Sequence, residues 1–79
     1  MPPRIDLAHL YENPAQASFR VLQRALTERG WERARVRGSH YIYRKPGWPG
    51  PISLPRGIKG TGTIRKIIRQ MQEEEQVNG

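Results

Sequence analysis

The chain has 79 residues, of which 35% are apolar, which is enough for one domain with a modest core. The absence of cysteine excludes disulfide bonds and thiolate metal sites, and two histidines with seven acidic residues predict neither a metal site nor a cofactor. No stretch approaches the ~18 apolar residues of a membrane span, and Met1–Tyr11 does not resemble a signal peptide. We therefore expect a cytoplasmic protein without membrane contact.

The net charge of +7 is distributed unevenly along the chain. Thirteen of the fourteen bases lie between Asn13 and Gln72, where Glu28 and Glu32 are the only acids. Such an excess indicates an anionic partner, most commonly a nucleic acid. Eleven of the fourteen basic residues are arginine, whose side chain favours forked contacts with phosphate and stacking on nucleobases.

Residues 1–12 are interpreted as an N-terminal extension with a short helical turn, for which Asp6 is a suitable N-cap. The first full helix is predicted to start at Asn13. Asparagine is a good N-cap, Pro14 suits the first helical position, and Gln16 follows three residues after the cap. The helix has one apolar stripe, formed by Ala15, Phe19, Leu22, Ala25 and Leu26.

Gly30 is expected to end this helix in the left-handed conformation, with Trp31 folding back on its last turn. Residues 31–45 then predict two strands joined by a tight turn at Gly38-Ser39, where glycine supplies a positive φ. A proline-rich stretch around Trp48 follows. It leads to a third strand at residues 52–54.

The last helix is predicted to be capped by Thr61 or Thr63 and to fray through the Glu73–Glu75 run. Its core-facing stripe has helical spacing and comprises Ile64, Ile67, Ile68 and Met71. The order α-β-β-β-α predicts a two-layer α+β domain over residues 13–72, with an acidic tail over 73–79. A three-stranded antiparallel sheet would carry both helices on one face, as in double-stranded-RNA-binding domains.

The two-residue turn predicts which side chains share a face of the hairpin. Arg37 would lie opposite His40, Arg35 opposite Ile42, and Arg33 opposite Arg44. The other face would turn Ala34, Val36, Tyr41 and Tyr43 toward the helices. A bulge or a longer turn would change this register and aim His40 elsewhere.

Four segments follow one another in a fixed order along the chain: Gly30-Trp31, Arg-Val-Arg-Gly-Ser-His-Tyr-Ile-Tyr-Arg (35–44), Leu-Pro-Arg (54–56) and Gly-Thr-Ile-Arg-Lys-Ile-Ile-Arg-Gln (62–70). Together they resemble the HicA family of small toxins from toxin–antitoxin pairs. The resemblance covers residues 17–71. The chain departs from the family in its longer N-terminal stretch, in the loop at 57–61 and in the proline-rich segment around Trp48.

The resemblance implies a fold like that of double-stranded-RNA-binding domains, cleavage of mRNA, and inhibition by a HicB-type antitoxin that covers the site. The family's catalytic histidine, in its Gly-Ser-His turn, corresponds to His40. Histidine can act as a general acid or base near neutral pH without a metal. The candidate RNA- and phosphate-binding residues are Arg33, Arg35, Arg37, Arg44, Lys45, Arg56, Lys59, Arg65, Lys66 and Arg69.

Two alternatives remain open at the level of sequence. The chain could be a non-catalytic RNA-binding module with the same fold, or a basic domain that docks an acidic protein partner. In the absence of the antitoxin we expect a monomer or a weak dimer.

Overall fold

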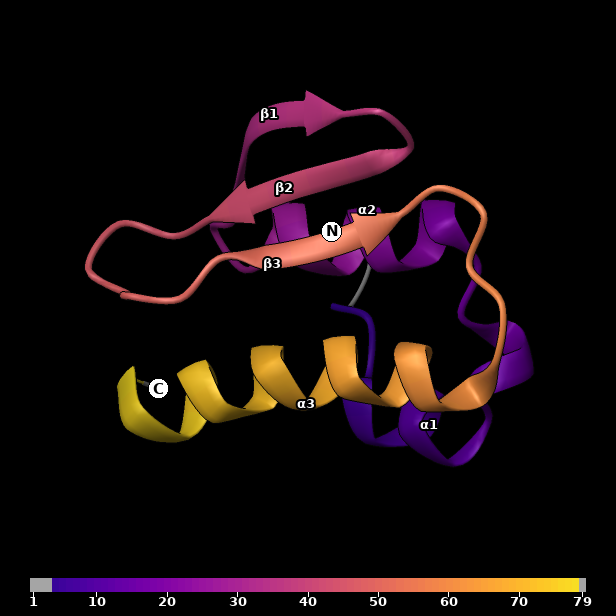
Figure 1. Ribbon diagram of the computed structural model, residues 1–79. Coiled ribbons are helices and arrows are strands. Elements are labelled where there is room, and N and C mark those ends of the chain that lie inside the picture. The colour runs from indigo at the N-terminus through magenta and orange to yellow at the C-terminus, as the bar shows by residue number, and fades with distance from the viewer. Residues whose placement is uncertain (1–3, 79) are drawn as a thin grey trace.

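The computed structural model describes residues 4–78 and confirms the predicted α+β class (Figure 1). A three-stranded antiparallel sheet has the order β1-β2-β3, as predicted. The helix α2 crosses behind the sheet, and α3 runs along β3 (Figure 1). The elements are α1 (Leu7–Glu12), a 3-10 helix η1 (Pro14–Gln16), α2 (Phe19–Glu28), β1 (Glu32–Arg37), β2 (His40–Arg44), β3 (Ile52–Pro55) and α3 (Thr61–Asn78).

The predicted start of the first full helix at Asn13 is wrong, since α2 begins only at Phe19. Ser18 is the N-cap, and its hydroxyl accepts a hydrogen bond from the Val21 N–H at 3.2 Å. Asn13 instead closes α1, because its side-chain amide donates to the carbonyl of His9 at 2.8 Å. The residues that looked like a cap followed by a helix thus end one helix and form the separate 3-10 turn η1.

The C-terminus of α2 matches the prediction. Gly30 has φ +86°, its N–H donates to Thr27, and the Trp31 N–H donates back to Leu26 at 3.0 Å. This pair of bonds is the Schellman arrangement, which satisfies carbonyls at the end of a helix. It reverses the chain and buries Trp31 in the core at 2% exposure.

The N-terminal segment is part of the hydrophobic core. Asp6 caps α1 as predicted, by accepting from the His9 N–H. Leu7 and Leu10 are buried against the body, and α1 packs on α3. None of the helices in the described part of the chain is long and apolar enough to cross a membrane.

Strand β1 lies outside the layer of helices. All six of its residues are exposed, including Ala34 and Val36, which were expected to face the helices. The core beneath the sheet is formed instead by Tyr43 of β2 and by Ile52 and Leu54 of β3. The helices cover only β2 and β3, so the β1 side of the hairpin extends past them at the top of Figure 1.

The expected fraying of α3 through the Glu73–Glu75 run is also wrong, because the helix continues to Asn78. Glu74 is 3% exposed, and its carboxylate lies 2.8 Å from the Lys45 ammonium group. Glu75 pairs with the buried Arg29 at 2.7 Å. Glu74 and Glu75 thus provide counter-charges to Lys45, which follows β2, and to Arg29, which caps α2.

Two carboxyl groups, those of Glu74 and Glu28, have pKa values lowered by their hydrogen-bond partners. The pKa of Glu74 falls because Lys45 hydrogen-bonds to the carboxylate, although desolvation opposes the shift. The pKa of Glu28 falls chiefly because the Ile5 N–H donates to it at 2.9 Å, with Arg24 contributing further. A carboxyl group with a lowered pKa stabilises the fold above its unfolded pKa, here 4.5, and loses that contribution as the pH falls below it.

Truncating Leu10 to alanine should cost about 2–5 kcal/mol of unfolding free energy, because it leaves a cavity between α1 and α3. Val77, which is 70% exposed, offers a control, and Val77→Ala should cost under about 0.5 kcal/mol. Urea unfolding of the purified variants measures both. Equal stability of the two variants would show that α1 is not part of the folded core.

Replacing Glu74 by glutamine should destabilise the fold at pH 7 by roughly 1–3 kcal/mol, because Lys45 loses its counter-charge. The loss is limited because the Lys45 side chain stays partly in contact with water. Glu73→Gln is the matched control, since Glu73 is exposed on the same helix. Thermal unfolding between pH 7 and pH 3 should show that Glu74→Gln reduces the loss of stability below pH 4.5. An unchanged pH dependence in Glu74→Gln would contradict the assignment.

Candidate functional site

The hairpin turn sets the position of His40. Gly38 has φ +61°, whereas Ser39, like every described residue other than glycine, does not have a positive φ. A positive φ at the first of the two turn residues alone is the pattern of a type II′ turn. Arg37 pairs directly with His40, as the two-residue turn predicts. The carbonyl of Ser39 accepts from the Arg56 N–H at 2.8 Å, which ties the segment after β3 to the turn.

His40 opens onto a groove of about 400 Å³ between the outer face of the sheet and α3. On the strand pairing, His40 lies opposite Pro55 and Ile42 opposite Ser53, so these four side chains share one face. The helix α3 forms the opposite wall. The groove is lined by His40, Pro51, Ser53, Pro55, Thr63, Lys66, Ile67 and Gln70.

A β-bulge changes the predicted face of one arginine. The register between β1 and β2 shifts between Arg33 and Arg35, so Arg33 pairs with Tyr43 and not with Arg44 as expected. The Arg33 guanidinium lies 5.8 Å from the centre of the Tyr41 ring, on the face turned toward the helices. Glu32 takes the position opposite Arg44 and places an acid on the outer face.

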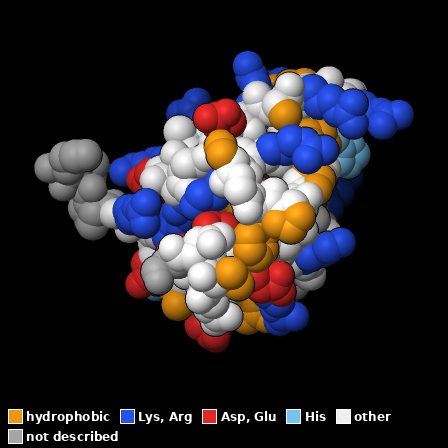
Figure 2. Space-filling view, turned by 90° about the vertical axis from the view of Figure 1, so that its left-hand side faces the viewer, with side chains coloured by type: hydrophobic (Ala, Val, Ile, Leu, Met, Phe, Trp, Pro, Cys, Tyr) orange, Lys and Arg blue, Asp and Glu red, His pale blue; other side chains and the backbone are white. Residues whose placement is uncertain are grey.

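Besides Arg33, five candidate basic residues are exposed on the hairpin and on the segment that follows β3. They are Arg35, Arg37, Arg44, Arg56 and Lys59. Figure 2 shows Lys and Arg side chains gathered at the upper right, next to a histidine. The β1–β2 hairpin and the outer face of the sheet both lie in that direction. Exposed bases around one histidine form a surface suited to a polyanion.

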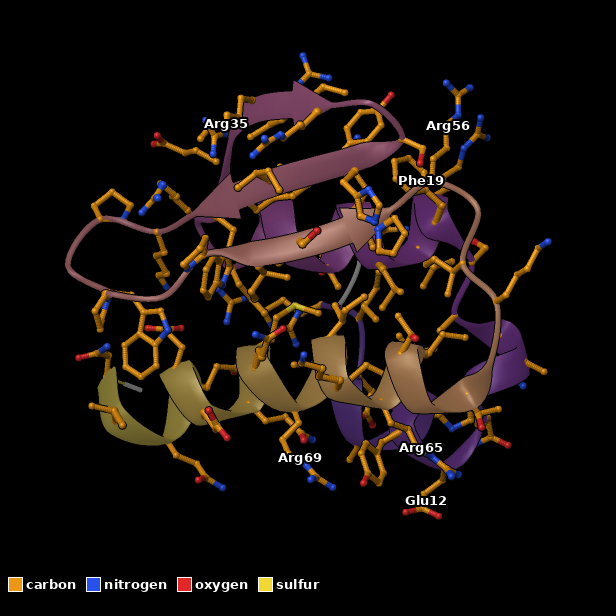
Figure 3. All side chains as sticks on the ribbon, in the orientation of Figure 1. Glu12, Phe19, Arg35, Arg56, Arg65 and Arg69 are labelled. Atoms are coloured by element: carbon orange, nitrogen blue, oxygen red, sulfur yellow. The ribbon has the colours of Figure 1, made fainter. Side chains whose placement is uncertain are left out.

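Three other candidate bases take part in contacts within the fold. Lys45 pairs with Glu74, as described above. Arg65 donates to the Tyr11 carbonyl at 2.9 Å, and Arg69 donates to the Tyr11 hydroxyl. Both guanidinium groups also lie over the Tyr11 ring, at 5.2 and 5.6 Å from its centre. Figure 3 shows Arg65 and Arg69 on the side of α3 turned toward α1, far from Arg35 and Arg56.

The structure adds three polar groove residues that sequence reasoning missed: Ser53, Thr63 and Gln70. Alternation along β3 places Ser53 on the outer face, because Ile52 and Leu54 are buried. Positions 63, 66, 67 and 70 lie on one side of α3 by helical spacing. What the sequence did not indicate is that this side of α3 flanks the sheet.

The second histidine lies on α1, outside the groove. The His9 ring is exposed and lies 3.1 Å from the Gln16 side-chain oxygen, a contact that joins α1 to η1. Within residues 4–78 no three histidine or acidic side chains gather closely enough to hold a metal ion. His40 is therefore the imidazole that the groove offers to a ligand.

Comparison with known proteins assigns the chain to a family. The family model of the HicA toxins of bacterial toxin–antitoxin systems matches residues 19–72, which include β1, β2, β3 and most of α3. No curated protein and no solved structure matches the chain significantly. The α+β fold with its three-stranded antiparallel sheet first defines the structural class, and the family match then identifies the chain as a member of the HicA toxin family. Membership implies an antitoxin partner of the HicB type.

Proposed function

We propose that this toxin is a metal-independent endoribonuclease that cleaves mRNA in the cytoplasm, with His40 as its general acid and base. The observation that supports this most strongly is the exposed His40 at a groove, beside Arg37 on the sheet and facing a wall that carries Lys66. This arrangement occurs in a chain of the HicA toxin family. A HicB-type antitoxin would inhibit the toxin by covering this surface.

RNA supplies its own nucleophile, so the protein needs few groups. A neutral His40 nitrogen removes the proton of the ribose 2′-hydroxyl, and the 2′-oxygen attacks the adjacent phosphorus. The bond from phosphorus to the 5′-oxygen breaks, and the same ring returns the proton to that oxygen. The products are a 2′,3′-cyclic phosphate and a 5′-hydroxyl end.

The arginines provide the charge that this reaction requires. Negative charge grows on the phosphoryl oxygens as the 2′-oxygen attacks, and fixed cations stabilise it without rearrangement. Arg37 is the nearest exposed base to His40 in the strand register. Arg35, Arg44 and Arg56 would hold the flanking phosphates and set the path of the strand.

His40→Ala should abolish growth arrest on expression and reduce RNA cleavage by the purified protein by about 100-fold or more, because the proton carrier is removed. His9→Ala is the matched control and should remain toxic, since His9 lies on α1. Cleavage by the wild-type protein should persist in EDTA. Equal toxicity of His40→Ala, with folding confirmed by circular dichroism, would exclude His40 as the catalytic group.

Arg37→Ala should weaken RNA binding when both proteins also carry His40→Ala, which prevents cleavage during the titration. The slope of log affinity against log salt should fall by about 0.7, the value for one lost phosphate contact on a single strand. Arg20→Ala removes the same charge from the exposed side of α2 and should leave the slope unchanged. Identical slopes for the two variants would mean that the hairpin is not the RNA surface.

A further inference from the structure

We infer that the groove between β3 and α3 is a subsite for one unpaired nucleotide of the RNA, with Lys66 on its phosphate and Gln70 and Ser53 on its base. This inference rests on the proposed ribonuclease function and specifies how the substrate is selected. Unpaired RNA is then the substrate class.

The size of the groove suits a single nucleotide. Its volume of about 400 Å³ lies in the lower part of the range for small-ligand sites, about 300–1,000 Å³. A base paired in a duplex cannot enter such a groove, because its stacked neighbours and its partner strand stay attached. RNA recognition by sequence commonly takes unstacked single-stranded bases into pockets.

The walls of the groove match the parts of a nucleotide. Pro51 and Pro55 provide apolar surface for the flat nucleobase. The Gln70 amide offers both a donor and an acceptor to a base edge, and the Ser53 hydroxyl can do either. Lys66 supplies a cation, and none of the lining residues is acidic.

The groove also has a limit that favours one nucleotide over several. Beyond Gln70, the neighbouring hollow is lined by Trp48 and by the acidic Glu73. A carboxylate there repels the next phosphate of a strand. At the other end lies His40, where the chain is to be cut. The nucleotide in the groove is therefore a neighbour of the scissile bond.

The residues that would read the base lie on rigid elements. Ile67, Ile68 and Met71 are buried at 2% exposure or less, which fixes the rotation of α3 about its axis. Gln70 and Lys66 lie on the flank of the same helix. A nucleobase read from the packed helix α3 and from β3, whose Ile52 and Leu54 are buried, meets groups that cannot move away from a poor match, and this is what selectivity requires.

The first test is cleavage of a mixed-sequence single-stranded RNA by the 79-residue protein, with cut sites mapped by primer extension. Gln70→Leu keeps the volume of the side chain and removes its amide, so it should redistribute the cut sites, because the base in the groove is no longer read through that amide. A merely structural role would lower all sites equally. An unchanged site pattern in both Gln70→Leu and Ser53→Ala would overturn the inference.

The second test is binding in the His40→Ala background, which needs no cleavage. Lys66→Gln should weaken binding of a single-stranded RNA hexamer by about tenfold, as expected for the loss of a charge-assisted contact. Arg20→Gln is the matched charge control and should have no such effect. Binding by Lys66→Gln equal to that of the parent, or equal affinity of the parent for a duplex of the same sequence, would overturn the subsite.

The two proposals fail in different ways. If the wild-type protein cleaves RNA and His40→Ala does not, but the groove variants match the wild type, only the subsite is wrong. If the wild-type protein and His40→Ala are equally inactive, the ribonuclease function fails. The hexamer binding of Lys66→Gln then still decides whether the groove holds RNA.

Discussion

One buried guanidinium joins the segments on which the rest of the structure depends. Arg29 ends α2 at 8% exposure, and its donors reach Glu75 of α3 at 2.7 Å, the Ile5 carbonyl at 2.6 Å and the Ala25 carbonyl at 3.3 Å. A buried charge is tolerated only when its hydrogen bonds are satisfied. Arg29 meets that condition by holding the N-terminal segment, α2 and α3 together, and this places α3 along the edge of β3, where it forms a wall of the groove.

The basic residues consequently fall into two populations. Arg29, Lys45, Arg65 and Arg69 have partners inside the molecule, and those contacts stabilise the fold. The bases of the β1–β2 hairpin are exposed on a strand that the helices do not cover. Charge counted along the sequence does not separate these populations, because the Glu73–Glu75 run and Tyr11 are far from their partners in the chain. The excess of positive charge therefore overstates the part available to an anionic ligand.

The sequence predicted those features that local rules determine. The Gly38-Ser39 turn, the pairing of Arg37 with His40 and the end of α2 at Gly30 each follow from a glycine with positive φ. The bulge at Arg33 was missed, because an extra residue in a strand leaves no mark in an arginine-rich run. The start of α2 was missed because Asn13 and Pro14 fit a helix start as well as Ser18 does. The groove was missed because it depends on how α3 lies against the sheet.

The exposed hairpin also bears on which ligands the protein can bind. Positively charged side chains close together on a two-stranded ribbon repel one another, and this repulsion opposes the compact state. Strand β1 contributes no buried residue to offset that cost. Any anionic ligand that binds the ribbon, whether an RNA strand or an acidic surface of the antitoxin, relieves the repulsion and is favoured for that reason. Under the proposed function both ligands would compete for the same charges around His40, so an antitoxin with an acidic surface would inhibit the toxin by occupying the ribbon in place of RNA.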